Sequence, residues 1–113
     1  MNSIYVTSDF LEVSQNAMNF SAALARQFEA DLTLLHAYHL TPIYSDFYVD
    51  LREEQLKQLR MDSEWQLKSW CDEQMKDGNF QCYIRQRNGL AADVIVDLVN
   101  EEQPDLLVMG TRK

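Results

Sequence analysis

Four apolar runs, separated by three amphipathic stretches, constrain what this 113-residue chain can fold into. The clearest runs are residues 32–38 and 106–109, in which most side chains are apolar. Nearly unbroken apolar runs that alternate with helices are typical of strands buried on both faces of a parallel sheet. We therefore predict an α/β domain with strands near residues 3–8, 31–38, 80–86 and 105–109.

The stretches between these runs carry the three- and four-residue apolar spacing of helices, over residues 13–28, 49–77 and 90–102. Their predicted buried faces consist of Val13, Ala17, Phe20, Leu24 and Phe28; then Leu56, Leu59, Leu67, Trp70 and Met75; then Leu90, Val94, Ile95 and Leu98. All three glycines fall at boundaries between elements, in agreement with this segmentation. The alternation predicts one doubly wound, open parallel sheet, with residues 1–113 as a single domain.

Charge and cysteine content narrow the classes of partner and location. Ten basic and eighteen acidic residues give a net charge of -8, and an acidic surface repels phosphate backbones, so we expect no nucleic-acid partner. No signal peptide and no apolar run of about 18 residues is present, so we expect a cytoplasmic protein that does not enter a membrane. In that compartment Cys71 and Cys82 are predicted to be reduced thiols, with a structural disulfide as the alternative.

In an open doubly wound sheet, ligands bind outside the carboxyl ends of the strands, where the strand order reverses. The segments at those ends are Thr7-Ser8-Asp9, Tyr38-His39, Arg87-Asn88-Gly89 and Met109-Gly110-Thr111. Asp9 is of most interest because a carboxylate there can accept hydrogen bonds from a ribose or a base. The alternative is that Asp9 caps the following helix. Position alone favours the cap.

Several kinds of site are not predicted. The glycine-rich fingerprints of dinucleotide-binding and P-loop proteins are absent. His36 and His39 are three positions apart on or near a strand, so they point to opposite faces and cannot share a metal ion. We predict a core histidine at position 36, no metal site and no catalytic residue. A phosphoacceptor receiver domain needs a carboxylate cluster for Mg²⁺ that includes one after the third strand, where this chain has Arg87-Asn88.

Three segments together resemble the universal stress protein family. They are residues 4–10 followed by Glu12, residues 30–37 and residues 104–111, which resemble the family's first strand, second strand, and fourth strand with the start of its phosphate loop. The resemblance implies the strand order 3-2-1-4-5, with the reversal between strands 1 and 4. It also implies that residues 1–113 hold four of these strands in the order 3-2-1-4, without the last helix and the fifth strand.

The resemblance also implies a ligand. In nucleotide-binding members of the family, the first-strand aspartate and its neighbours hold the adenosine, a second-strand residue contacts the adenine, and a glycine loop takes the phosphates. Carried over to this sequence, the cofactor-binding residues for ATP or AMP are Thr7, Ser8, Asp9, Ala37, Met109 and Gly110.

The phosphate motif of the family, G-2x-G-9x-G-[ST], departs from its pattern here because Gly110-Thr111-Arg112 is followed by Lys113. Two hypotheses therefore stand. The first is a stress-associated regulatory module that binds adenine nucleotide, forms a homodimer or part of a tandem protein, and is not an enzyme. The second is a family domain that has no nucleotide and acts through dimerisation and protein contacts.

Overall fold

The computed structural model describes residues 3–8, 12–38, 49–77 and 80–110, apart from the side chains of residues 12–14, 49–52 and 77. Strands β1 (Ser3–Thr7), β2 (Asp31–Tyr38), β3 (Cys82–Asn88) and β4 (Leu106–Val108) form one sheet. The strand order is β3-β2-β1-β4, and each of the three pairings is parallel. The predicted fold class and strand order are therefore confirmed.

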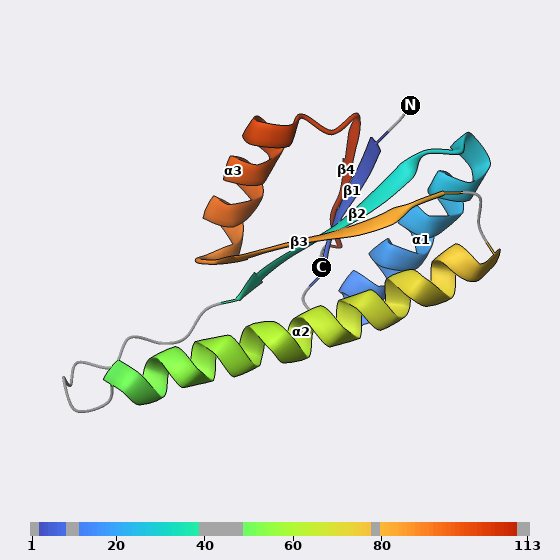
Figure 1. Cartoon of the computed structure of the whole chain (residues 1–113). Coiled ribbons are helices and arrows are strands. Elements are labelled where there is room, and N and C mark those ends of the chain that lie inside the picture. Colours follow the sequence, from blue (N-terminus) through green and yellow to red (C-terminus); the bar gives the residue numbers. More distant parts are fainter. Residues whose placement is uncertain (1–2, 9–11, 39–48, 78–79, 111–113) are drawn as a thin grey trace.

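Helices cover both faces of this sheet (Figure 1). Helices α1 (Glu12–Phe28) and α2 (Val49–Asp77) pack on one face, and α3 (Ala91–Glu102) packs on the other. The N-terminal part of α2 extends past the sheet (Figure 1). Because each β-α-β unit sends its helix to one face or the other, the arrangement is doubly wound, as predicted.

The two faces bury unequal cores. Between the sheet and helices α1 and α2, the buried side chains are Ile4, Val6, Ala17, Met18, Ala22, Ala25, Ala30, Leu32, Leu34, Leu67, Cys71, Phe80 and Cys82. Between the sheet and α3, they are Tyr5, Leu35, Val94 and Leu98. The α3 layer therefore contributes much less apolar burial than the opposite layer.

The predicted buried face of α1 is wrong in part. Phe20 and Phe28 are 59% and 47% exposed, although their spacing suggested burial. The helix instead meets the sheet with small side chains, among them Ala22 and Ala25, which are almost completely buried. A helix whose contact surface is made of alanines can lie close to the strands, and large rings at the margin of that surface then remain in solvent.

Helix α3 is fixed to the sheet by polar contacts near its C-terminal end. The Tyr5 hydroxyl donates a hydrogen bond of 2.8 Å to Glu102 Oε1, which also accepts one of 3.1 Å from Arg85 Nε. Arg87 makes a two-fold contact with Glu101, at 3.0 and 2.6 Å, and this hydrogen bonding lowers the pKa of the Glu101 carboxyl. These contacts join α3 to β1 and β3 at once.

The cysteines are paired, contrary to the prediction of reduced thiols. Cys71 of α2 and Cys82 of β3 form a disulfide, with their Cα atoms 5.4 Å apart. Both cysteines are buried in the larger core. The prediction rested on the expected compartment and could not include the packing of α2, which brings the two side chains together.

Candidate functional site

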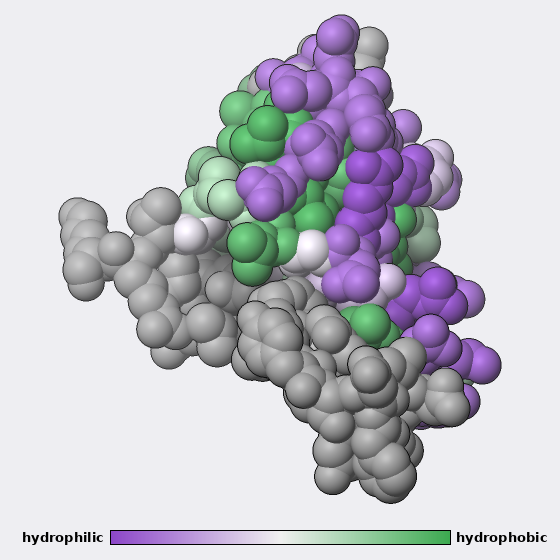
Figure 2. All heavy atoms as spheres, turned by 90° about the vertical axis from the view of Figure 1, so that its left-hand side faces the viewer, coloured by the Kyte–Doolittle hydropathy of each residue, from purple (hydrophilic) through white to green (hydrophobic). Residues whose placement is uncertain are grey.

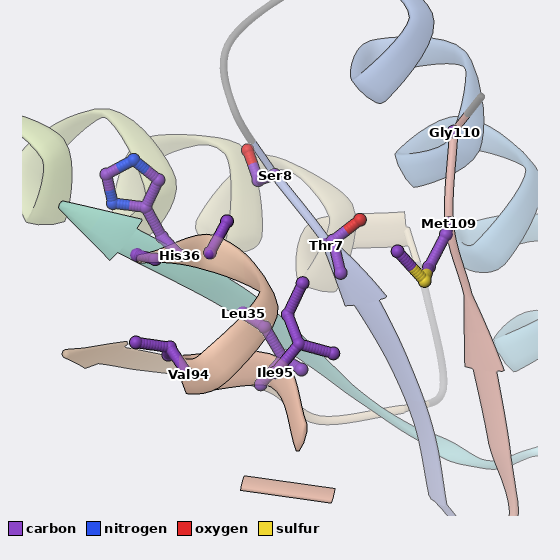
Figure 3. A pocket seen from close by; sticks show the side chains of 10 residues that line it. Thr7, Ser8, Leu35, His36, Val94, Ile95, Met109 and Gly110 are labelled. Atoms are coloured by element: carbon purple, nitrogen blue, oxygen red, sulfur yellow. The ribbon is translucent and has the colours of Figure 1, made fainter. Parts of the chain in front are cut away.

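A cavity of about 190 Å³ lies at the carboxyl ends of β1, β2 and β4 and is closed on one side by the first turns of α3 (Figure 3). Its lining residues are Thr7, Ser8, Leu35, His36, Ala37, Ala91, Val94, Ile95, Met109 and Gly110. Because β1 is paired with both β2 and β4, this is the edge of the sheet where the strand order reverses.

Five of the six residues predicted to bind a cofactor line this cavity. Thr7 is the last residue of β1 and Ser8 follows it, Ala37 belongs to β2, and Met109 and Gly110 follow β4. The sixth, Asp9, lies outside the described residues. Parallel strands bring their carboxyl ends to the same edge, which is why segments so far apart in sequence meet here.

Ser8 has an unusual environment. The residue is 5% exposed, and its backbone N–H donates a 2.8 Å hydrogen bond to the Leu35 carbonyl. Its hydroxyl Oγ has no hydrogen-bond partner among the described residues. The Oγ atom is almost completely buried, so it is not itself exposed to the cavity, and leaving it without a partner costs about 1–3 kcal/mol.

The start of α3 forms a wall of the cavity that the sequence analysis did not assign to the site. Ala91, Val94 and Ile95 line it, and Leu90 is an N-cap residue without a side-chain cap hydrogen bond. Leu90 was predicted to face inward, but it is 57% exposed because its extended backbone precedes the helix.

Gly89 allows the first turns of α3 to lie close to the end of β2. Its φ is +153°, and a Cβ atom at this position would lie 3.1 Å from Val94 Cγ2. Its N–H donates a 2.9 Å hydrogen bond to the carbonyl of Tyr38, which fixes the turn against the end of β2. Glycine is required here both for the backbone angle and for the close approach of the helix. In the sequence, the Asn88-Gly89 turn marked where α3 begins, but it did not indicate how close the helix lies to the cavity.

His36 borders the cavity, but its ring belongs to the other face of the sheet. The imidazole lies on the α2 side (Figure 3), where Nδ1 is 2.9 Å from Gln86 Oε1. Gln86 Nε2 in turn donates to the Arg60 carbonyl of α2 at 3.4 Å. The ring is buried and hydrogen-bonded, as expected of a core histidine, and it is not aimed at a ligand in the cavity.

The surface near the cavity is mixed in polarity. Seen from the left-hand side of Figure 1, an apolar area lies between hydrophilic side chains (Figure 2). Leu90, Val96 and Met109 are large apolar side chains that are about half exposed. No group of three or more potential metal ligands is found in the described part of the chain. None of the helices described there is long and apolar enough to span a bilayer.

Comparison with known proteins gives the same fold. UspA from Lactobacillus plantarum, a universal stress protein, superimposes with a TM-score of 0.81 at 18% identity, over 99% of this chain and 80% of that one. A universal stress protein in complex with cAMP gives a TM-score of 0.64 at 23% identity, over 95% and 74% of the two chains. A universal stress protein family protein from Arabidopsis thaliana with AMP bound gives 0.62 at 19% identity, over 98% and 77%.

No curated protein matches this sequence significantly. The family model described as "Universal stress protein family" matches residues 1–113, which is the whole chain. The three resembling segments, the strand order and this match agree with one another. The chain belongs to the universal stress protein family.

Proposed function

We propose that this chain is a stress-associated regulatory module that binds an adenine nucleotide, AMP or ATP, at the carboxyl ends of β1, β2 and β4. The observation that carries the proposal is the cavity at the carboxyl ends of β1, β2 and β4, which five of the six predicted cofactor-binding residues line. Two relatives of the same fold are described with cAMP or AMP bound, which supports a nucleotide as the ligand.

The proposed contacts divide along the cavity. Asp9 and its neighbours Thr7 and Ser8 hold the adenosine portion. Ala37 lies against the base, and the backbone at Met109 and Gly110 approaches the phosphates. A volume of about 190 Å³ is below the ~300–1,000 Å³ of common small-molecule sites, so it suits the base with part of the ribose.

Binding is expected to be weak on the phosphate side. Glycine permits positive φ and close approach to phosphates, whereas Lys113 at the second glycine position of the motif costs about 1–2 kcal/mol if a left-handed backbone is required there. The charges of Arg112 and Lys113 offset part of this, but as salt-screened contacts. ATP should therefore gain little over AMP or adenosine, and should lose that gain as salt rises.

Isothermal titration calorimetry with adenosine, AMP and ATP at two salt concentrations tests the proposal. Asp9→Ala should weaken adenosine binding by about 1–3 kcal/mol, for the loss of a hydrogen bond to the carboxylate. Asp72→Ala, at an exposed position of α2, serves as the matched control and should bind as the unchanged protein does.

Two results would count against the proposal. Tight, salt-insensitive ATP binding that survives Asp9→Ala would refute the assigned contacts. Absence of heat with all three ligands, together with a stable oligomer, would favour the second hypothesis, a family domain that acts through protein contacts.

A further inference from the structure

A second cavity, of about 240 Å³, lies between α2 and the ends of β2 and β3. We call it the α2 cation cavity, and its lining residues are Tyr38, Leu56, Lys57, Arg60 and Asn88. Side chains alternate between the faces of a strand, so Tyr38 and His36 point to the α2 side while Ala37 points to the α3 side. The α2 cation cavity and the proposed nucleotide site are thus on opposite faces of the same sheet.

Charge distinguishes the α2 cation cavity from the rest of this acidic molecule. Lys57 and Arg60 are three residues apart on α2, a spacing that places two side chains on the same side of a helix. Within the described part of the chain, the ion pairs are Arg85 with Glu102 and Arg87 with Glu101, and neither cation of the cavity forms one there. Arg60 also lines a neighbouring cavity, together with Glu64, Ile84 and Gln86.

The polar groups around the α2 cation cavity are rich in hydrogen-bond donors. Lys57 offers an ammonium, Arg60 a guanidinium fork, and Asn88 an amide NH₂. Tyr38 adds a hydroxyl and, with Leu56, an apolar surface. A carboxylate carries one charge and would match one cation, whereas a phosphate group carries about −1.5 to −2 charges at pH 7 and presents three acceptor oxygens.

We propose that the α2 cation cavity binds a phosphate group, as inorganic phosphate or as a small phosphomonoester whose organic part lies on Tyr38 and Leu56. The inference is independent of the proposed nucleotide site, whose phosphates would lie near Gly110 after β4. Strands β1 and β2 separate β4 from β3. Both sites can therefore be occupied in one molecule.

Backbone amide NMR on the full chain tests the proposal with two probes, inorganic phosphate and phenyl phosphate, against sodium chloride at equal ionic strength. Phosphate should cause saturable shifts at Tyr38, Lys57, Arg60 and Asn88 that chloride does not reproduce. Equal affinity for both probes would assign the site to free phosphate. Tighter binding of phenyl phosphate would assign it to an organic phosphomonoester.

Matched variants separate a site from general charge attraction. The pair Lys57→Gln with Arg60→Gln should weaken binding at least tenfold. The pair Lys68→Gln with Lys76→Gln removes the same charge from the same helix, outside the cavity, and should change binding less than twofold. All four substitutions are at exposed positions, and an unchanged amide spectrum elsewhere confirms folding.

The proposal is overturned if phosphate and chloride give the same shifts, or if the two pairs of substitutions weaken binding equally. Adenosine titrated into the Lys57→Gln, Arg60→Gln protein should bind as it does to the unchanged protein. A loss of phosphate binding with adenosine binding intact therefore supports this site without reference to the proposed nucleotide site. Loss of both would instead mean that one site had been mistaken for two, which also overturns the proposal.

Discussion

Tyr5 is a buried residue that joins β1 to the last turn of α3 through its hydrogen bond to Glu102. Burial, first, and then the hydrogen bond to Glu102 raise the pKa of Tyr5 above its ordinary value of 10.0. The folded state therefore holds the proton more tightly than the unfolded state. The stability that follows is present in full below pH 10 and is lost as the pH rises through the folded-state pKa.

We predict that Tyr5→Phe lowers the free energy of unfolding by about 1 kcal/mol at pH 7, since one hydrogen bond is lost while Arg85 still pairs with Glu102. Above pH 10 the difference between the two proteins should shrink, because only the unchanged protein loses this contribution. Urea unfolding at pH 7 and pH 10.5 measures both values. A difference that stays constant across this range would contradict the argument.

At the scale of elements, α1 shows how close packing depends on small residues. Ala22 is 1% exposed between the helix and the sheet, whereas Phe20 is exposed. We predict that Ala22→Leu destabilises the fold by about 1–3 kcal/mol through overpacking, and that Phe20→Gln changes stability by no more than about 0.5 kcal/mol. Thermal unfolding of both variants checks this. The reverse order would mean that Phe20 is covered by a partner in solution.

The disulfide between α2 and β3 leads to a second prediction about how the elements are held together. Cys71 and Cys82 are 11 positions apart, and closing a loop of this size stabilises a fold by about 2–3 kcal/mol. Equilibrium urea unfolding with dithiothreitol should therefore show lower stability than unfolding without it. The protein with Cys71→Ala and Cys82→Ala should show no effect of the reductant. Two free thiols in protein purified without reductant would contradict the pairing.

The order of elements could be predicted from the sequence because buried strands and amphipathic helices differ in period, and glycines mark their limits. The buried face of α1 could not be predicted from the sequence. Periodicity gives a phenylalanine more weight than an alanine, but close approach of a helix to a sheet requires the smaller side chain. Strand β3 begins at Cys82 and ends at Asn88, two residues later than predicted, because it pairs with residues 32–38 of β2 up to the end of that strand.

The candidate site could likewise be predicted from the sequence only in part. Thr7, Ser8 and Gly110 could be proposed from the sequence because they stand at or just beyond the ends of strands. Ala37 was proposed only through the resemblance to the family. The wall formed by α3 could not be proposed, because its position depends on the φ of Gly89 and on packing between distant segments. The disulfide, likewise, depends on where α2 crosses β3.

Considered as a whole, the molecule has two unlike edges. The edge strand β3 carries Arg85 and Arg87, charges that discourage pairing with another sheet. The other edge strand of the described part, β4, carries only Leu106, Leu107 and Val108, each half-buried. An apolar edge without charge is a template for strand addition.

We predict that the β4 edge is covered in solution, by further chain or by a second copy. Light scattering on the 113-residue chain should show association that increases with concentration and that Leu107→Lys reduces. Tyr83→Lys, on the charged β3 edge, is the control and should leave association unchanged. A chain that stays monomeric at high concentration, with Leu107 well ordered, would contradict this prediction.

The unequal cores on the two sheet faces imply unequal opening. Because α3 is held by few buried apolar side chains and by ion pairs that are partly exposed, it should detach in a partial unfolding step that leaves α1 and α2 in place. Amide hydrogens of Val94 and Leu98 should then exchange with deuterium faster than those of Ala22 and Ala25, which mass spectrometry or NMR can measure. Since α3 also forms a wall of the 190 Å³ cavity, a ligand bound there would slow exchange in α3 more than in α1. The α3 layer, which is the least protected against hydrogen exchange, would then show by its rate of opening whether a ligand occupies the cavity.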